Sequence, residues 1–543
     1  MTDQTSTPTP GGNWIGTLST TDPLATKAGI DVLRSGGSAV DAAIAANAVL
    51  SVTAQHMCGL GGDLLAIVYD PSQADLNKRV VGLNSSGTSS KRASAARLRA
   101  EGKAAMPRSG RIESVTVPGC VDGWSELHAR YGQLPWSRLF DSAIELARNG
   151  FAASETFTED AEEISALKAA SEFRSSFNKH YETGTLVRRP GIAGVLENLQ
   201  RGSRDDFYLR GFGQELIEIS AGYFDKNDFV SSCARWVEPI SVDAFGRTIH
   251  SLPPNSQGAV LLAASSIADE IGVTGELQQD ELMHVLIESA RLGGFDRNQW
   301  LCDGAEFYTH FTTSELSRRA SLFDRERSVI LPDAYTESGD TIALLAVDSS
   351  GLGISLIQSN ASSFGSRLLT PTSQIFLHNR GMGFSLEPDS PNEFGPNKRP
   401  MHTLTPVLAT KPGGKLDLLV GTMGGDAQPQ ILLQLLVNRL ILNMEPEAAI
   451  SASRFILEPP APLQTQTFST WEKKGKVSVR LESTANPQLA INLKRRGHSV
   501  RTAIPLDSTF GHSHMIQITD SAAVGFCDER SRGGICLQGF VRP

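Results

Sequence analysis

The sequence predicts an α+β fold, with helices concentrated early in the chain and strands concentrated late. Residues 120–300 mostly follow the 3.6-residue period of helices, with short polar breaks. From residue 341 onward, apolar runs alternate with glycine turns, which is typical of strands. Hydrophobic residues make up 40% of the 543 residues and charged residues 20%, so the chain can form a large packed core.

The charge balance argues against nucleic acid binding. Lys and Arg number 50 and Asp and Glu 59, which gives a net charge of −9, and no dense basic run is present. The longest apolar stretch, residues 42–52, contains Asn47 and Ser51 and is much shorter than the ~20 residues that span a bilayer. We therefore expect no nucleic acid partner and no membrane span.

The N-terminal sequence and the cysteines indicate a cytoplasmic protein. The segment MTDQTSTPTPGGN has neither the charged region nor the apolar region of a secretory signal. The six cysteines are scattered, without the spacing of a metal site or a disulfide framework, which is usual in a reducing compartment. We expect no cofactor and no metal.

The first elements can be placed from composition and glycine positions. Residues 1–20 are rich in Thr, Ser, Pro and Gly and are expected to form a flexible arm. Residues 23–50 have a helical pattern that Gly36 and Gly37 interrupt, so we expect one helix to end there and a second to begin near Asp41.

A glycine loop at residues 56–63 leads into the next expected element, a buried strand at residues 64–70. Further helices are expected at residues 123–131, 139–149 and 280–293.

A hairpin is predicted where the strand-rich part begins. Residues 341–348 and 354–359 are apolar runs joined by a glycine turn, which is a strong hairpin signal. A second glycine turn, residues 423–426, is expected to open a helix over 430–443. Other expected strands are residues 416–421, 477–481 and 514–518.

Eight short motifs, in this order along the chain, resemble those of the γ-glutamyltranspeptidase family of N-terminal-nucleophile hydrolases. The resemblance covers residues 23–540, and no single motif carries it alone. The motifs are residues 36–43, 56–62, 117–123, 131–136, 339–341, 363–366, 396–400 and 421–425.

The resemblance implies a four-layer αββα sandwich, built as one large domain from a single chain that cuts itself. The cut would fall between Asp340 and Thr341. After the arm, residues 21–340 would form the large subunit and residues 341–543 the small one. The two would remain together as a heterodimer, and a dimer of such heterodimers is a further expectation.

The roles implied for the reactive residues agree with elementary chemistry. A threonine hydroxyl is a weak nucleophile that needs a base, and an N-terminal Thr341 would carry one in its own α-amine. The equivalents of Gly424 and Gly425 form the oxyanion hole, and a helix start offers suitable backbone donors. Ser359 is the matched position of a hydroxyl that steadies the amine. A strand-to-helix turn and an ordinary strand serine are the alternative interpretations of these residues.

The substrate-contacting positions depart from the glutathione-type pattern. Ser86 stands where an arginine would hold the substrate α-carboxylate, and a serine cannot supply that bidentate fork. Met382 and Gly383 replace the acidic residue expected to bind the α-amino group. His402 and Thr403 replace a serine pair. These departures suggest that γ-glutamyl recognition has been lost. The candidate substrate-binding residues are Ser86, Asn360, Arg380, His402 and Thr403.

A sub-branch that includes oxamate amidohydrolase looks more similar. Its segments match residues 83–87, 253–258 and 421–426. The function expected is self-processing hydrolysis of a small amide, with oxamate as a candidate. A glutathione hydrolase or γ-glutamyltransferase, and a non-catalytic member of the family, are the alternatives.

Two further groups of residues are given little weight. His512 and His514 could face one side of a strand as metal ligands do, but no third ligand is specified. Cys58 near His56 could suggest a thiol nucleophile, but the surrounding glycines match the packing loop of the family.

Overall fold

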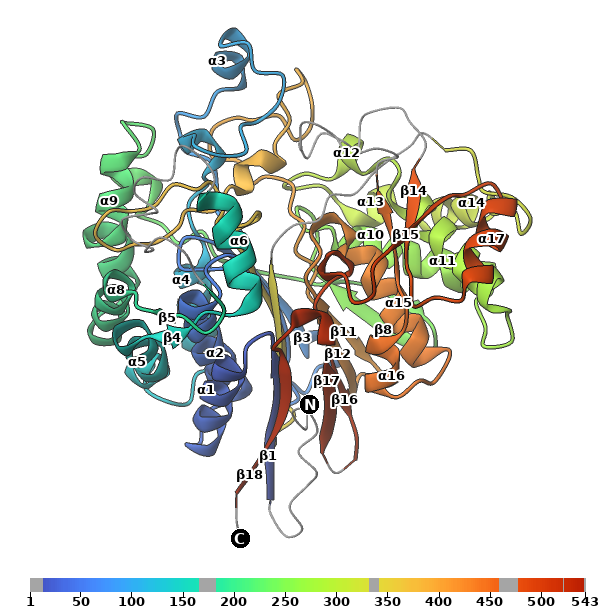
Figure 1. The fold of residues 1–543 in the computed structure, drawn as a ribbon, viewed down its shortest axis with the longest axis horizontal. Helices are drawn as coiled ribbons and strands as arrows, with labels where there is room; N and C mark the ends of the chain where they lie inside the picture. Colours follow the sequence, from blue (N-terminus) through green and yellow to red (C-terminus); the bar gives the residue numbers. More distant parts are fainter. Residues whose placement is uncertain (1–12, 166–181, 332–340, 459–476, 521, 542–543) are drawn as a thin grey trace.

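The computed structural model describes residues 13–165, 182–331, 341–458, 477–520 and 522–541. It has an α+β fold, as predicted, with two large sheets between two groups of helices (Figure 1). None of the helices in these ranges is long and apolar enough to cross a membrane.

The first sheet has seven antiparallel strands and carries the predicted hairpin at its centre. Its order is β18 (Ile535–Val541), β1 (Asn13–Thr20), β9 (Ile342–Asp348), β10 (Gly353–Ser359), β2 (Asp63–Tyr69), β3 (Val80–Ser85) and β6 (Arg235–Val237).

The second sheet has six antiparallel strands. Its order is β17 (Ala523–Cys527), β16 (Ser513–Ile518), β12 (Leu416–Thr422), β11 (Val407–Thr410), β8 (Arg247–Ser251) and β7 (Ile240–Ala244). Smaller sheets join β13 (Phe455–Glu458), β14 (Ser478–Glu482) and β15 (Ser499–Ala503), and β4 (Phe151–Ala152) with β5 (Leu186–Val187).

The faces that the two sheets turn toward each other are apolar. In one buried cluster, Ile67 and Leu345 of the first sheet pack with Leu408 and Leu419 of the second. Alternate residues of β2, such as Leu64, instead face the helices on the other side. Because β2 is buried on both faces, its sequence is a continuous apolar run.

Helices cover the outer face of each sheet (Figure 1). Those in the core against the first sheet include α1 (Pro23–Arg34), α2 (Ala39–Thr53), α4 (Cys120–Tyr131), α5 (Asp141–Asn149), α8 (Pro190–Arg201) and α9 (Phe212–Ile219). Those against the second include α10 (Gly258–Ile271), α11 (Gln279–Gly294), α14 (Thr313–Ala320), α15 (Gln428–Leu440), α16 (Pro446–Ser451) and α17 (Pro487–Arg495). The remaining α-helices are α3 (Ala95–Ala100), α6 (Glu155–Ser165), α12 (Arg297–Trp300) and α13 (Phe307–His310).

The expectation of a flexible arm over residues 1–20 is wrong for Asn13–Thr20, which form β1 between β18 and β9. Neighbouring elements satisfy the polar side chains of this strand. Thr17 Oγ1 donates to the carbonyl of Ala523 (2.9 Å), and Ser19 Oγ bonds His514 Nδ1 (2.8 Å). Residues 1–12 lie outside the described residues.

Other differences are smaller. The short strands β6, β7 and β8 lie within the part expected to supply helices. Helix α2 begins at Ala39 rather than near Asp41, because Ser38 and Asp41 form a capping box. Helix α15 covers Gln428–Leu440 instead of 430–443.

Candidate active site

Three neighbouring strands bring the site together at one end of the first sheet. Thr341 directly precedes β9, Ser359 ends β10, and Asp63 begins β2, where it pairs with Ser359 across the two strands. Thr341 Oγ1 donates a hydrogen bond to Ser359 Oγ at 3.1 Å, and both side chains are buried. The predicted nucleophile and the predicted second hydroxyl are therefore in contact.

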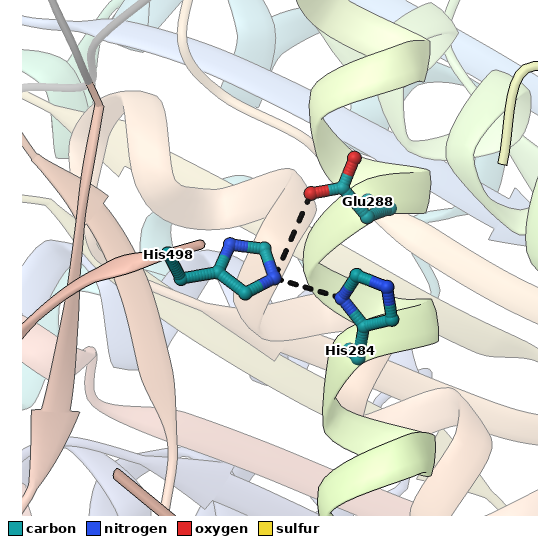
Figure 2. A group of neighbouring side chains, drawn as sticks. All are labelled: His284, Glu288 and His498. Carbon is teal, nitrogen blue, oxygen red and sulfur yellow. Dashed lines mark hydrogen bonds and ion pairs between the residues drawn. The ribbon is translucent and has the colours of Figure 1, made fainter. Parts of the chain in front are cut away.

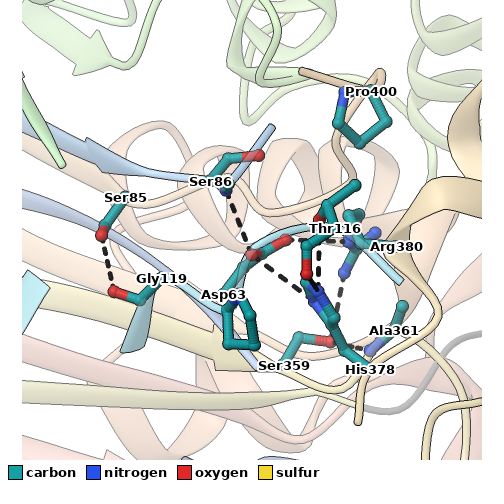
Figure 3. A network of polar contacts seen from close by, with 12 residues as sticks. Asp63, Ser85, Ser86, Thr116, Gly119, Ser359, Ala361, His378, Arg380 and Pro400 are labelled. Carbon is teal, nitrogen blue, oxygen red and sulfur yellow. Dashed lines mark hydrogen bonds and ion pairs between the residues drawn. The ribbon is translucent and has the colours of Figure 1, made fainter. Parts of the chain in front are cut away.

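Arg380 connects this hydroxyl pair to the predicted substrate-binding residues. Its Nη2 donates to Ser359 Oγ (3.2 Å) and its Nη1 to Thr403 Oγ1 (2.9 Å). Its Nε lies 3.6 Å from Asp63 Oδ2 (Figure 3). Burial lowers the pKa of the guanidinium to about 10, and the attraction of Asp63 limits that decrease.

Asp63 is the centre of a buried polar network. Its Oδ1 lies 3.4 Å from His378 Nδ1 (Figure 3). Its Oδ2 accepts from His402 Nε2 (2.9 Å). Burial by itself would raise the pKa of Asp63, but His378 and His402 outweigh burial and hold it well below the ordinary value.

His402 is the neutral hydrogen-bond donor of this network. Burial, with the nearby Arg380 cation, lowers its pKa to about 4. The backbone N–H of Leu404 donates to its Nδ1 (3.3 Å). Nδ1 is therefore the acceptor, so Nε2 carries the proton that is donated to Asp63.

Ser86 lies beside the network without bonding Arg380. Its hydroxyl accepts from Asn255 Nδ2 (3.4 Å), and the backbone carbonyl of Asn255 accepts from the N–H of His402 (2.9 Å). Its own N–H donates to Asn84 Oδ1 (3.0 Å). Ser86 thus reaches the site through Asn255.

Asn360 is the predicted substrate-binding residue that the structure brings least clearly into the site. Its Nδ2 donates to the carbonyl of Gln55 (3.0 Å), and its N–H donates to that of Met57 (3.0 Å). These contacts fix the glycine loop before β2, and none of its described hydrogen bonds reaches Thr341 or Arg380.

The turn after β12 contains Gly424 and Gly425, the residues predicted to supply the backbone donors. Gly424 has φ 136° and Gly425 has φ 54°, which are left-handed conformations that favour glycine. The short helix η7 (Gly425–Ala427) and then α15 follow at once. The first N–H groups of a helix have no partner within it, so this turn offers amides at a positive helix end.

Gln257 and Arg297 hold this turn against the rest of the site. Gln257 Nε2 donates to the carbonyl oxygens of Gly425 (2.9 Å) and Thr403 (2.7 Å). Buried Arg297 Nη1 donates to Gln257 Oε1 (2.8 Å) and to Asp426 Oδ1 (2.7 Å).

The sequence analysis did not single out Asp63, His378, Asn255, Gln257 or Arg297. Asp63 ends the quoted glycine loop, and a carboxylate directly before an apolar strand was a usable signal. Asn255 and Gln257 lie in the segment 253–258 that was matched as a whole.

The imidazoles of His512 and His514 bond to different partners. His514 Nδ1 bonds Ser19 Oγ, and His512 Nε2 bonds Ser508 Oγ, both at 2.8 Å. Burial lowers the pKa of both, to about 3 for His514 and about 4 for His512. His514 thus links β1 to the second sheet, and His512 is buried directly before β16.

A group of three potential metal ligands, His284, Glu288 and His498, lies between α11 and the segment before β15 (Figure 2). His284 Nδ1 and His498 Nε2 are 2.7 Å apart. Two nitrogens on one tetrahedral zinc ion would be about 3.3 Å apart. Glu288 Oε1 already accepts from Arg291 Nη1 (2.7 Å). These contacts describe a hydrogen-bonded histidine pair rather than a preformed metal site.

Comparisons with known proteins agree with this fold and these motifs. The family model described as Gamma-glutamyltranspeptidase matches residues 25–537. The chain belongs to the γ-glutamyltranspeptidase family, whose members are N-terminal-nucleophile hydrolases.

Two of its curated relatives are proenzymes that match over almost their whole length. The glutathione hydrolase-like YwrD proenzyme of Bacillus subtilis is 30% identical over 523 residues, covering 94% of this chain and 96% of the relative. The oxamate amidohydrolase proenzyme of Klebsiella pneumoniae is 28% identical over 530 residues, with the same coverage. The resemblance to the oxamate amidohydrolase sub-branch is thereby confirmed.

Among solved structures, the cephalosporin acylase from Bacillus halodurans superposes with a TM-score of 0.84. It is 27% identical, and the match covers 99% of both chains. Family membership supports an amidohydrolase or γ-glutamyltranspeptidase-like activity.

Proposed function

We propose that this protein is a self-processing amidohydrolase that hydrolyses a small amide through an acyl-enzyme on an N-terminal threonine. The observation that carries the proposal is the buried hydrogen bond between Thr341 Oγ1 and Ser359 Oγ at the end of the central hairpin. Because the chain belongs to the γ-glutamyltranspeptidase family, we interpret Thr341 as the nucleophile and Ser359 as the hydroxyl that steadies its amine. Oxamate is the candidate substrate, because an oxamate amidohydrolase is among the relatives.

The chain would first cut itself between Asp340 and Thr341. Thr341 Oγ attacks the carbonyl carbon of residue 340, the C–N bond breaks, and the nitrogen leaves as an amine. Water then hydrolyses the resulting ester. Before the cut that nitrogen is an amide and cannot accept a proton, so processing itself produces the base.

The two products would remain one αββα sandwich, a heterodimer of the chain's own parts. Each sheet contains strands from both sides of residue 341, and β9 lies between β1 and β10. Separating the parts would therefore expose unpaired strand edges and apolar core.

In turnover, the α-amine of Thr341 takes the hydroxyl proton while Oγ attacks the amide carbonyl of the substrate. Ser359 orients the amine, and the N–H groups of Gly424 and Gly425 stabilise the oxyanion. The amide nitrogen leaves as ammonia or an amine, and water releases the acid. Ser86, Asn360, Arg380, His402 and Thr403 are the residues proposed to form the substrate pocket.

A denaturing gel tests the processing step. We expect two chains for the wild type and one for Thr341→Ala, with the N-terminal sequence of the smaller chain beginning Thr-Ile-Ala-Leu. Another starting residue in an active preparation, or an uncut and inactive wild type, contradicts the proposal and favours a non-catalytic family member.

A pair of substrates separates the two enzymatic alternatives. We expect ammonia release from oxamate and little p-nitroaniline release from γ-glutamyl-p-nitroanilide, because Ser86, Met382 and Gly383 replace the groups that hold a γ-glutamyl moiety. Strong turnover of the glutamyl compound would instead identify a glutathione hydrolase or γ-glutamyltransferase.

A further inference from the structure

Arg380 is a buried cation with more donors than the described residues satisfy. Its side chain is 1% exposed, and a guanidinium carries five N–H bonds. Thr403 Oγ1 and Ser359 Oγ each accept one hydrogen bond from Arg380, and Nε has no hydrogen-bond acceptor among the described residues. Leaving buried donors unpaired is costly, so this guanidinium is suited to bind another acceptor.

Asp63 orients Arg380 without saturating it. The ion pair between Nε and Asp63 Oδ2 is 3.6 Å long, which is beyond a good hydrogen bond. The same oxygen accepts from His402 at 2.9 Å. The carboxylate is thus shared, and Arg380 keeps its ability to form a bidentate pair with a second carboxylate.

The position of Arg380 also limits the length of what it can bind. Ser359 Oγ lies 3.1 Å from Thr341 Oγ1 and 3.2 Å from Arg380 Nη2, so a single hydroxyl separates the proposed nucleophile from the cation. An acyl group whose carbonyl carbon meets Thr341 can reach Arg380 with an anionic group that follows directly or one carbon further on.

We propose that Arg380 binds a carboxylate on the acyl side of the scissile amide, so that the substrate is the monoamide of a short dicarboxylic acid. Asp63 is the positioning residue that holds Arg380 in place. The inference rests on the proposed function and adds the substrate class to it. It moves carboxylate recognition from the position of Ser86 to Arg380, next to the hydroxyl pair.

Product binding to the processed wild-type enzyme tests the proposal without turnover. In isothermal titration we expect oxalate to bind and the neutral isostere oxamide to bind about 100-fold more weakly. Arg380→Gln should weaken oxalate binding about 30-fold or more and weaken oxamide binding much less, with Arg380→Lys in between. Equal affinity for oxalate and oxamide in the wild type overturns the proposal, even if Arg380→Gln fails to fold.

Steady-state kinetics with an anionic and a neutral substrate test the role of Asp63. Asp63→Asn should raise KM for oxamate about tenfold and raise KM for oxamide much less, because only the anionic substrate uses the oriented guanidinium. A loss of the same size on both substrates shows a merely structural role and overturns the assignment.

The proposed function can survive the failure of this inference. Two chains on the gel together with hydrolysis of oxamide and oxamate at equal rates would retain the threonine hydrolase and reject carboxylate recognition. An uncut wild type that binds no oxalate would reject both.

Discussion

The geometry of the proposed oxyanion site depends on Gly424. Its φ of 136° is one that other residues rarely adopt, and a Cβ added there would lie 2.9 Å from Ile431 Cδ1. The turn it forms joins β12 to η7 and places the backbone amides at the start of a helix. A side chain at this position must therefore distort the turn or push away the first part of α15.

We expect Gly424→Ala to lower the free energy of unfolding by about 1–3 kcal/mol and to lower kcat about 100-fold. Gly413→Ala is the matched control, since Gly413 also has positive φ (93°) but nothing lies within 4 Å of the added Cβ. The control should lose about 1 kcal/mol and keep its kcat. Urea unfolding and ammonia release measure the two effects. Equal losses of kcat in both variants would argue against an oxyanion role for this turn.

The residues of the site differ in how visible they were in the sequence. Thr341, Gly424 and Gly425 lie in short motifs, and Ser359 is assigned through the same family resemblance, so these residues could be identified without a fold. The position of Asp63 before an apolar strand was a local signal, but its partner could not be predicted, because His402 lies 339 residues away and only strand pairing brings the two together. Local sequence carries no information about such a contact.

Among the elements, the hairpin β9–β10 was predictable and β1 was not. Strand β9 is a nearly continuous apolar run, β10 carries Ile354, Leu356 and Ile357, and the two flank a glycine turn, and these are local signals. Strand β1 is rich in Thr, Ser and Gly, and it forms because β18 and β9 pair with its two edges. Tertiary contacts therefore outweighed a composition typical of a loop.

Helix α2 has a cap that also fixes a distant loop. Asp41 Oδ2 accepts from the N–H of Ser38 (3.0 Å), and also from those of Gln133 (2.8 Å) and Leu134 (3.0 Å) after α4. The capping carboxylate is fully buried, so removing it leaves three donors without an acceptor.

We expect Asp41→Ala to lower the free energy of unfolding by about 3 kcal/mol or more. Ser38→Ala removes one capping bond only and should cost about 1 kcal/mol. Asp31→Ala on the solvent-facing side of α1 is the control, and its loss should stay near 0.5 kcal/mol because exposed ion pairs are weak. The measurement is urea unfolding of the three variants, and equal losses for Asp41→Ala and Ser38→Ala would contradict the loop contact.

Across the whole molecule, the two parts that flank residue 341 are joined by more than strand pairing. Helix α11 precedes the proposed cut and His498 follows it, yet His284 Nδ1 and His498 Nε2 are hydrogen bonded at 2.7 Å. His284 Nε2 donates to the carbonyl of Asp324 (2.8 Å), so its Nδ1 is the acceptor and His498 the donor. The pair is neutral, and protonating either ring disrupts this contact or places a charge in the core.

This pair should make the stability of the molecule sensitive to acid. Burial, and then the neighbouring His284, lower the pKa of His498 to about 3, and burial also lowers that of His284. In the unfolded chain both titrate near 6.5. Above that pH the pair contributes its full stability. As the pH falls below 6.5 the unfolded chain binds more protons, and His498 alone costs about 1.4 kcal/mol per pH unit until the pH approaches its folded-state pKa of about 3. Urea unfolding of the processed protein should therefore show a free energy of unfolding that decreases from pH 8 to pH 5. His498→Gln should have a lower free energy of unfolding than the wild type at pH 8. Its free energy of unfolding should then decrease less steeply with falling pH, by the slope that corresponds to about one proton. An unchanged slope in the variant would mean that His498 takes up its proton equally in the folded and unfolded states, which contradicts a buried neutral pair.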